Sequence, residues 1–148
     1  MKIELCASAD HPGWLRLRQA LWPDCAREQH LAEMKHFVAN PQRYVHFIAY
    51  SATREAIGLA EASLRTDYVN GTESSPVGFL EGLYVVPQAR RRGVAAALVA
   101  SVCDWTRRAG CRELASDAVL ENSISHVVHQ ALGFEETERA VFFRRKLE

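Results

Sequence analysis

An apolar run, a basic turn and a long amphipathic segment follow one another along this chain, and their order restricts the fold strongly. The apolar run is Phe79–Val86, and Arg90–Arg92 with Gly93 form the turn. From the arginines to Ala109, apolar side chains recur at spacings of three and four, which is typical of an amphipathic helix. Gly110 follows as a helix stop signal. The order predicts a strand, a tight basic turn and a helix.

The basic turn is predicted to bind an anion. Backbone N–H groups and the positive end of the helix dipole converge at a helix N-terminus, which suits a phosphate group. The positive charges of the three arginines interact unfavourably with this dipole. Their placement therefore costs stability unless a bound anion offsets it. Gly93, which we expect inside the first turn, weakens a helix by about 1 kcal/mol relative to alanine, and it is useful mainly where a ligand approaches the backbone. A solvated helix start is the alternative, and the glycine and the charges favour a phosphate-bearing ligand.

Length and composition predict an ordinary globular protein. The chain has 148 residues, of which 48% are hydrophobic and 24% charged, so we expect one domain over residues 1–148. Eighteen basic residues balance eighteen acidic ones, which gives no reason to expect nucleic acid or a membrane as partner. The four cysteines show no C-x-x-C pair and no metal-ligand spacing, so we expect reduced thiols and no bound metal. The first residues lack the apolar stretch of a secretion signal, and we expect a cytoplasmic protein.

The hydrophobic pattern of the whole chain predicts a mixed α/β fold of the α+β kind. Strands are expected over 2–7, 44–50, 57–68, 79–86, 113–117 and 134–144. Helical stripes are expected to end at Pro23, Asn40–Pro41, Gly110 and Gly133. Asn122 is expected to be the N-cap of the last of these helices. The order β-α-α-β-β-β-α-β-α-β places helices on both faces of a mostly antiparallel sheet. The one parallel crossover joins 79–86 to 113–117, and the basic turn lies at the carboxyl end of its first strand, where ligands commonly bind.

Acidic side chains stand where apolar ones are expected. Glu81 interrupts the most hydrophobic strand candidate, and a lone carboxylate there is unfavourable unless it is paired or exposed in a cleft. A salt bridge to an arginine or an exposed edge position would explain it as well as a functional role would. Asp117 ends the parallel partner strand, and Glu135, Glu136 and Glu138 cluster near the C-terminus. Adjacent strands can bring such carboxylates together, which suits a cationic substrate or a general base.

Two histidines lie on the last expected helix, off its apolar stripe. His126 and His129 are three residues apart, but a metal would need further ligands, and none stands out. A surface or cleft-lining role is favoured for both. His129 lies closer to the buried flank of the helix and is the better candidate for proton transfer.

These pieces together resemble the GCN5-related N-acetyltransferase (GNAT) superfamily. Its turn reads Gln/Arg-x-x-Gly-x-Gly/Ala, and the corresponding residues here are Arg90-x-x-Gly93-x-Ala95. The resemblance covers about residues 79–134. It implies that the turn binds the pyrophosphate of acetyl-CoA and that the preceding strand pairs with the pantetheine arm. The implied coenzyme-binding residues are Leu83, Tyr84, Val85, Arg90, Arg91, Arg92, Gly93, Val94, Ala95, Ala96 and Asn122.

Over nearly the whole chain, the sequence is similar to the small chromosomal-type aminoglycoside 6′-N-acetyltransferases. The similarity is carried by Trp22-Pro23, Asp67–Pro76, Phe79–Gly82, Ala115–Asp117 and Leu132–Glu138. The stretch 67–76 is not a general superfamily feature, so it strengthens the substrate assignment beyond fold analogy. The resemblance implies an acetyl-CoA-dependent enzyme that acetylates the 6′-amino group of aminoglycosides and confers resistance. The implied aminoglycoside-binding residues are Trp22, Tyr68, Glu81, Asp117 and Glu138.

The resemblance also implies direct transfer in a ternary complex, without an acyl-enzyme. The amine must lose a proton before it attacks, and Glu81 or Asp117 would accept that proton, directly or through water. A backbone N–H near Val85 would stabilise the oxyanion. Many superfamily members place a tyrosine at the position of His129 as the acid for the departing thiolate. Here either the thiolate leaves unprotonated or His129 takes that role, so the candidate catalytic residues are Glu81, Asp117 and His129.

Two other functions fit parts of the pattern. One is an acetyltransferase of the same fold that acts on a polyamine or a protein N-terminus. The other is a non-catalytic acyl-CoA-binding module, against which the carboxylates Glu81 and Asp117 count. We also expect a homodimer, because the apolar segment Ala140–Phe143 can pair across a two-fold axis and the related enzymes are commonly dimers.

Overall fold

A computed structural model of the chain describes residues 1–147, and a five-stranded sheet in the order β1-β2-β3-β4-β5 forms its centre. The strands are β1 (Lys2–Leu5), β2 (Tyr44–Tyr50), β3 (Ala56–Arg65), β4 (Val77–Val85) and β5 (Leu114–Ala115). Strands β1 to β4 pair antiparallel with their neighbours, and β5 runs parallel to β4. The predicted mixed, mostly antiparallel sheet is therefore confirmed.

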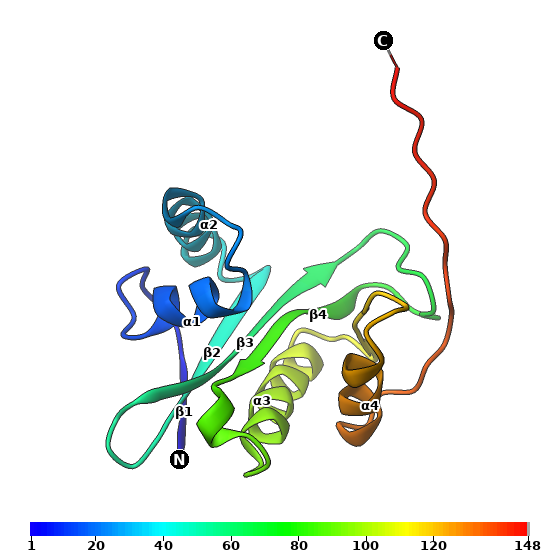
Figure 1. Cartoon of the computed structure of the whole chain (residues 1–148). Helices are drawn as coiled ribbons and strands as arrows, with labels where there is room; N and C mark the ends of the chain where they lie inside the picture. Colours follow the sequence, from blue (N-terminus) through cyan, green and yellow to red (C-terminus); the bar gives the residue numbers. More distant parts are fainter. Residues whose placement is uncertain (148) are drawn as a thin grey trace.

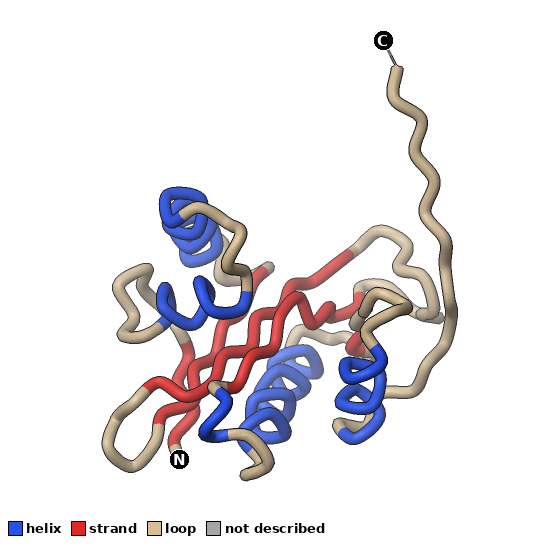
Figure 2. Tube along the Cα trace, in the orientation of Figure 1, coloured by secondary structure: helices blue, strands red, loops and turns tan. Residues whose placement is uncertain are grey.

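Helices cover both faces of this sheet, as predicted. Helices α1 and α2 lie on one face, and α3 and α4 lie on the other (Figure 1). The tube in Figure 2 shows how loops join these layers around the sheet. Among residues 1–147, none of the helices combines the length and hydropathy that crossing a bilayer requires. The helices are α1 (Trp14–Leu21), α2 (Arg27–Ala39), α3 (Val94–Arg108) and α4 (Ser123–Ala131), with a short 3-10 turn at Pro87–Ala89.

The core forms on both sides of the middle strands. Ile48 of β2 and Leu59 of β3 are completely buried. Trp14 and Met34 reach the sheet from the α1–α2 side, and Leu98 reaches it from the α3 side. Because β2 and β3 are covered on both faces, nearly all of their side chains are buried, which explains why their sequences read as apolar runs.

Strand β4 carries a β-bulge at Glu81. Glu61 of β3 lies opposite Gly82, and Ala62 lies opposite Leu80, so Glu81 is the extra residue. A bulge leaves its residue without a ladder partner and redirects its side chain. The bulge therefore explains how an exposed carboxylate stands in the middle of an apolar strand.

Helix α3 begins at Val94, so the arginines of the basic turn precede the helix and do not open it. Gly93 is the residue before the first helical one, and the expectation that it lies inside the first turn is wrong. Its backbone has φ 81°, in the left-handed region, which favours glycine. A Cβ at this position would meet no atom within 4 Å. The backbone conformation, and not crowding, therefore requires glycine here.

The C-terminal segment 134–144, predicted to be a strand, forms none. After α4 the described chain contains no helix or strand and runs away from the body of the protein (Figure 1). A strand needs a neighbouring edge as well as β-forming residues, and this segment pairs with none within its own described chain. Four other strands end earlier than predicted: β1 at Leu5, β3 at Arg65, β4 at Val85 and β5 at Ala115.

The four cysteines are free thiols, as expected. Cys6 and Cys111 are buried, and Cys25 and Cys103 are half-buried. Burial raises the pKa of the Cys6 and Cys111 thiols. A thiol whose pKa is raised is a poor nucleophile at neutral pH, so neither side chain is suited to covalent catalysis.

Candidate active site

A cavity of about 950 Å³ opens between α1 and α2 on one side and β2, β3 and β4 on the other. Its size suits a drug-sized ligand. Five carboxylates and three guanidinium groups line it, and this excess of acidic groups favours a cationic ligand. The charged residues are Asp24, Glu33, Glu61, Asp67, Glu81, Arg18, Arg43 and Arg65. Of the predicted substrate-binding residues, Trp22 and Glu81 line this cavity.

Glu81 reaches the cavity from the bulge, and its carboxylate accepts hydrogen bonds from two residues of β3. Nη2 of Arg65 donates to the two carboxylate oxygens at 2.5 and 3.2 Å. The hydroxyl of Ser63 donates to Oε1 at 3.2 Å. The guanidinium of Arg65 also lies 3.7 Å from the centroid of the Phe79 ring. A salt bridge to an arginine, one of the explanations left open by the sequence, is therefore present.

Trp22 forms the wall of the cavity beside this bulge. It follows α1, and its ring lies so close to Gly82 that a Cβ there would come within 2.6 Å of the indole. Gly82 is therefore required by the close approach of a side chain. The guanidinium of Arg18 lies 4.9 Å from the centre of the same indole, in a cation–π contact.

A buried ion pair lies at the base of the cavity. Arg18 of α1 and Glu61 of β3 pair there, and each side chain is only 3% exposed. Nε1 of Trp14 donates to the second carboxylate oxygen of Glu61 at 2.9 Å. Burial raises the pKa of Glu61, while Arg18 and Trp14 oppose that shift by stabilising the carboxylate. His46, packed between Trp14 and Phe37, has its pKa lowered to about 3 by burial and then by Arg18, so its ring is neutral.

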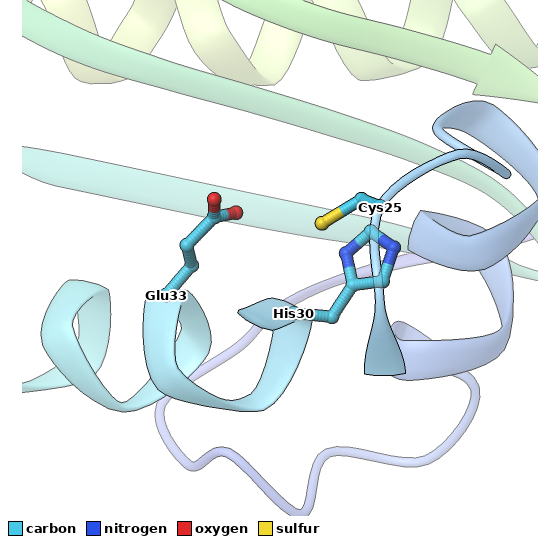
Figure 3. Close-up of side chains that lie close together, drawn as sticks. All are labelled: Cys25, His30 and Glu33. Carbon is cyan, nitrogen blue, oxygen red and sulfur yellow. The ribbon is translucent and has the colours of Figure 1, made fainter. Parts of the chain in front are cut away.

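Three potential metal ligands meet in the wall of this cavity. Donor atoms of Cys25, His30 and Glu33 lie within 4.8 Å of one another, and Figure 3 shows the three side chains converging. Arg18 already contacts two members of this cluster. Its Nε donates to Nδ1 of His30 at 3.2 Å, and its Nη2 pairs with Glu33. Nε2 of His30 faces the carbonyl oxygen of Trp22 at 3.3 Å. The guanidinium supplies the positive charge, so the cluster does not require a metal.

The second candidate carboxylate, Asp117, follows β5. Its side chain is exposed and does not line the cavity. The hydroxyl of the preceding residue, Ser116, lies 3.5 Å from the carbonyl oxygen of Leu80. Leu80 is the neighbour of Glu81, so the chain leaving β5 runs beside the bulge. The structure thus brings the two carboxylate-bearing segments together at the β4–β5 junction.

Helix α4 brings His129 to the same junction. The helix begins after Asn122, whose Oδ1 accepts the N–H of Ser125 at 3.1 Å, so the predicted N-cap is confirmed. Nδ1 of His129 faces the carbonyl oxygen of Ser125 at 2.7 Å, and Nε2 lies 2.8 Å from the hydroxyl of Ser116. Since a carbonyl oxygen only accepts, the proton is assigned to Nδ1, and Nε2 accepts from Ser116.

Tyr68 and Glu138 lie apart from the lining of the cavity. Tyr68 stands in the loop after β3 and is 75% exposed. A Cβ at Gly71 in that loop would lie 2.1 Å from Oγ1 of Thr137 and 3.9 Å from Cβ of Glu138. The structure therefore places Glu138 against the loop that carries Tyr68, and it does not join this pair to Trp22.

The predicted coenzyme-binding residues gather on β4 and at the start of α3. Strand β5 pairs with β4 only through Gly78 and Phe79, so the edge of β4 at Leu83–Val85 has no strand partner on that side within residues 1–147. The first hydrogen bond at this end of α3 joins the N–H of Ala97 to the carbonyl of Gly93. The N–H groups before Ala97 are therefore available to an anion at the helix end.

The three arginines of the basic turn have different positions. Nε of Arg90 donates to the carbonyl of Val85 at 2.9 Å, and its guanidinium lies 5.8 Å from the Tyr84 ring. Arg90 therefore fastens the turn to the end of β4. Arg91 and Arg92 are exposed, and Arg91 adopts a left-handed backbone with φ 62°. Their positive charge faces solvent beside the start of α3.

The cations of the cavity, above all Arg18 and Arg65, were not predicted from the sequence. Arg18 had a signal, because it lies on the apolar face of its helix, four residues after Trp14 and one after Leu17. A charged residue on a buried face needs a buried partner. Arg65 had no such signal, since its pairing with Glu81 depends on the register at the bulge.

Comparison with known proteins identifies the family. Residues 12–134 match the acetyltransferase (GNAT) family. An aminoglycoside N(6′)-acetyltransferase type 1 from Acinetobacter baumannii is 50% identical over 147 residues, covering 99% of each chain. One of the same name from Stenotrophomonas maltophilia is 53% identical over 146 residues, covering 99% of this chain and 94% of the relative.

Solved structures agree with the sequence comparison. The aminoglycoside 6′-N-acetyltransferase of Acinetobacter haemolyticus, in its apo form, superposes with a TM-score of 0.92 at 46% identity over 100% of both chains. The enzyme AAC(6′)-Iy in complex with a bisubstrate analogue of CoA and acetylneamine has a TM-score of 0.89 at 46% identity, covering 99% of this chain and 100% of that one. The chain therefore belongs to the GNAT acetyltransferases and, within them, to the aminoglycoside N(6′)-acetyltransferases.

Proposed function

We propose that this protein transfers the acetyl group of acetyl-CoA to the 6′-amino group of an aminoglycoside. The observation that carries the proposal is Glu81, which the bulge of β4 places in a cavity lined by five carboxylates. Aminoglycosides carry several ammonium groups, and an acidic cavity attracts them. The names of the relatives point to the same substrate class. Acetylation of this amine would confer resistance to the drug.

Acetyl-CoA supplies a thioester whose acetyl carbon an amine can attack. We propose that backbone N–H groups of Gly93–Ala96 hold its pyrophosphate, with added positive charge from Arg91 and Arg92. The free edge of β4 at Leu83–Val85 would pair with the amides of the pantetheine arm. Arg90 would support coenzyme binding indirectly, because its hydrogen bond to the carbonyl of Val85 fixes the turn to the end of β4.

Direct transfer requires a neutral amine. Glu81 or Asp117 would accept the amine proton, directly or through water. The new C–N bond then forms while the thioester C–S bond breaks, and a backbone N–H near Val85 would stabilise the negative oxygen in between. A covalent intermediate on Cys6 or Cys111 is disfavoured, because burial raises the pKa of both thiols.

His129 is the proposed source of the proton for the departing thiolate. Its Nδ1 is fixed by the carbonyl of Ser125, so Nε2 faces the hydroxyl of Ser116. In its protonated form, His129 can donate from Nε2 through this hydroxyl toward β4. Departure of an unprotonated thiolate is the alternative, and the kinetics of a His129 variant distinguish the two.

The remaining substrate contacts are proposed from the resemblance and from position. Trp22 offers an aromatic wall to the sugar rings, and Glu81 offers a counter-ion. Asp117, Tyr68 and Glu138 lie outside the cavity lining, on segments that border the β4–β5 junction or the loop after β3. We propose that these three close over the part of the aminoglycoside that extends out of the cavity.

We propose that the protein is a homodimer in which the C-terminal segment packs on a second copy. Val141, Phe142 and Phe143 are 76%, 89% and 92% exposed, which is unfavourable for an isolated chain in water. Their segment is rich in β-forming residues and can add a strand to an open sheet edge of a partner. Light scattering should give a dimer for the natural chain and a monomer for the double variant Phe142→Ser, Phe143→Ser. A natural chain that is monomeric at working concentration contradicts this assembly.

We propose the cytoplasm as the site of action. The four cysteines are free thiols, which is usual in a reducing compartment. Acetyl-CoA is also a cytoplasmic metabolite. Cell fractionation followed by detection of the chain checks this placement, and recovery in a secreted fraction would contradict it.

A thiol-release assay with acetyl-CoA tests the proposed activity. The acceptors are kanamycin, tobramycin, spermidine and a peptide with a free N-terminus. Turnover that is fastest with the two aminoglycosides supports the proposal. Faster turnover with spermidine or the peptide would mean that the enzyme acts on a polyamine or a protein N-terminus. Coenzyme binding without turnover on any amine would indicate a binding module.

A further inference from the structure

One arginine in the cavity occupies a position where a cationic substrate would be expected. Arg65 of β3 donates from Nη2 to the two carboxylate oxygens of Glu81, at 2.5 and 3.2 Å. Its guanidinium rests 3.7 Å from the centre of the Phe79 ring. Arg65 is therefore held by one carboxylate and one aromatic face, both at the β4 wall of the cavity.

The surroundings of Arg65 differ from those of Arg18, the buried arginine of the same cavity. Arg18 is 3% exposed and pairs with Glu33 and Glu61. The Arg65–Glu81 pair is 37% and 34% exposed. A half-exposed ion pair contributes little free energy because water screens it, whereas a buried pair is difficult to break without leaving a charge unpaired. Arg18 is thus a fixed part of the structure, and Arg65 can be displaced.

An incoming ammonium group competes with Arg65 for the same carboxylate. Glu81 has two oxygens, and Ser63 and Arg65 both donate to Oε1 while Arg65 also approaches Oε2. A second cation beside Arg65 would be repelled by it. For a substrate amine to reach Glu81, the guanidinium must move aside along the face of Phe79 or out into solvent.

We infer that Arg65 is a specificity-determining residue, an internal cation that holds the ammonium site of Glu81 until a polycationic acceptor displaces it. This inference rests on the proposed function of the cavity. An acceptor with several ammonium groups also gains contacts with Asp24 and Asp67, the lining carboxylates that lie outside the Arg18 ion pairs, and so offsets the displacement. An acceptor with few charges does not gain them. Arg65 therefore lowers the affinity for all amines but lowers it more for weakly charged ones.

Substitution of Arg65 tests the inference directly. The variant Arg65→Met keeps a long apolar stem against Phe79 and removes the charge, and Arg65→Lys retains the charge. Arg107→Met is the matched control, because it removes one positive charge from an exposed ion pair on α3, far from the cavity lining. Calorimetry with tobramycin in the presence of CoA, at two salt concentrations, gives the dissociation constant and its salt dependence.

The expected result is that Arg65→Met binds tobramycin about three- to tenfold more tightly than the natural chain, with a steeper salt dependence. Arg65→Lys and Arg107→Met should stay within about twofold of the natural chain. The preference for tobramycin over spermidine, measured as the ratio of kcat/KM values, should fall in Arg65→Met. Thermal unfolding of each variant checks that the fold is retained.

Weaker or unchanged binding in a folded Arg65→Met variant overturns the inference. Weaker binding would mean that Arg65 contacts the substrate, and unchanged binding would mean that it does not compete. Either outcome leaves the proposed function standing if the natural chain acetylates aminoglycosides. Absence of turnover by the natural chain on any aminoglycoside instead refutes the proposed function itself.

Discussion

The part of the chain up to β5 and the part after it differ in how completely they are packed. Side chains with no exposed surface, such as Trp14, Ile48 and Leu98, all lie before β5. From Ser116 to the last described residue, 147, no side chain is buried, and Phe143 is 92% exposed. The first part supports its own structure, whereas the second presents apolar side chains that another surface can cover.

The candidate site takes residues from both parts of the chain. Trp22 and Glu81 belong to the packed part, where Gly82 and Arg18 contact Trp22. Ser63 and Arg65 hold Glu81 there. Asp117 and His129 belong to the exposed part. The cavity is therefore preformed in one chain, and we expect the second group of residues to depend more on assembly and on bound ligands. Substitutions on the two sides separate these contributions.

The largest effect is expected from the carboxylate of the packed part. Glu81→Gln should lower kcat/KM for an aminoglycoside by about 100- to 10,000-fold, because it removes the proposed proton acceptor and counter-ion. Asp117→Asn should lower it by about tenfold or more. Steady-state thiol release measures both, with Glu55→Gln on an exposed turn as control. Unchanged kinetics in Asp117→Asn would remove Asp117 from the mechanism, and a larger loss there than in Glu81→Gln would reverse the assignment.

The next effect concerns stability of the packed part. Arg18→Met leaves Glu61 buried without its ion-pair partner and should cost about 3–5 kcal/mol of unfolding free energy. Adding Glu61→Leu should restore much of the loss, since the unpaired charge disappears. Urea unfolding measures these changes, and Arg107→Met, from an exposed pair, should change little. A loss in Arg18→Met no larger than in Arg107→Met would mean that the buried pair does not stabilise the fold.

A smaller effect is expected from acid, again in the packed part. The pKa of His46 is lowered to about 3 from an ordinary value of 6.5. The unfolded chain therefore binds one more proton between these values, and stability falls as pH falls through this window. Between pH 6.5 and 4.5 the natural chain should lose about 2 kcal/mol more than His46→Gln. Burial shifts the pKa of Glu61 in the opposite sense, but that group is present in both proteins. Equal pH dependence of the two in urea unfolding would contradict the prediction.

The smallest effect is expected at His129, in the exposed part. His129→Gln should lower kcat by about tenfold or less, since a thiolate is already a good leaving group and the residue only assists its protonation. Steady-state thiol release at saturating substrates measures kcat for the variant and the natural chain. Equal kcat values would show that the thiolate leaves without help from His129.

Local patterns in the sequence predicted most of the packed part. The strand, basic turn and helix from Phe79 to Ala109 are set by apolar spacing and by glycine, both of which act over a few residues. Asn122 was predicted as an N-cap for the same reason, and its side chain accepts the N–H of Ser125. Such features need no knowledge of distant contacts.

Pairings between residues far apart in the chain were harder to predict from the sequence. Arg18 and Glu61 lie 43 positions apart, and Arg65 meets Glu81 only because a bulge shifts the register of β4. The β-forming residues of 134–144 predicted a strand that the described chain does not form, since strand formation depends on an edge and not on propensity alone. The carboxylate Glu81 was found from the sequence, but Arg65, the arginine that pairs with it, was not.

One pair of substrates tests the proposed activity most directly. Neomycin and paromomycin differ only in the 6′ position, which carries an amine in the first and a hydroxyl in the second. The account predicts thiol release with neomycin, a product whose added acetyl group is located on the 6′-nitrogen by NMR, and little turnover of paromomycin. Equal turnover of the two, or acetylation of neomycin at another nitrogen, would contradict it.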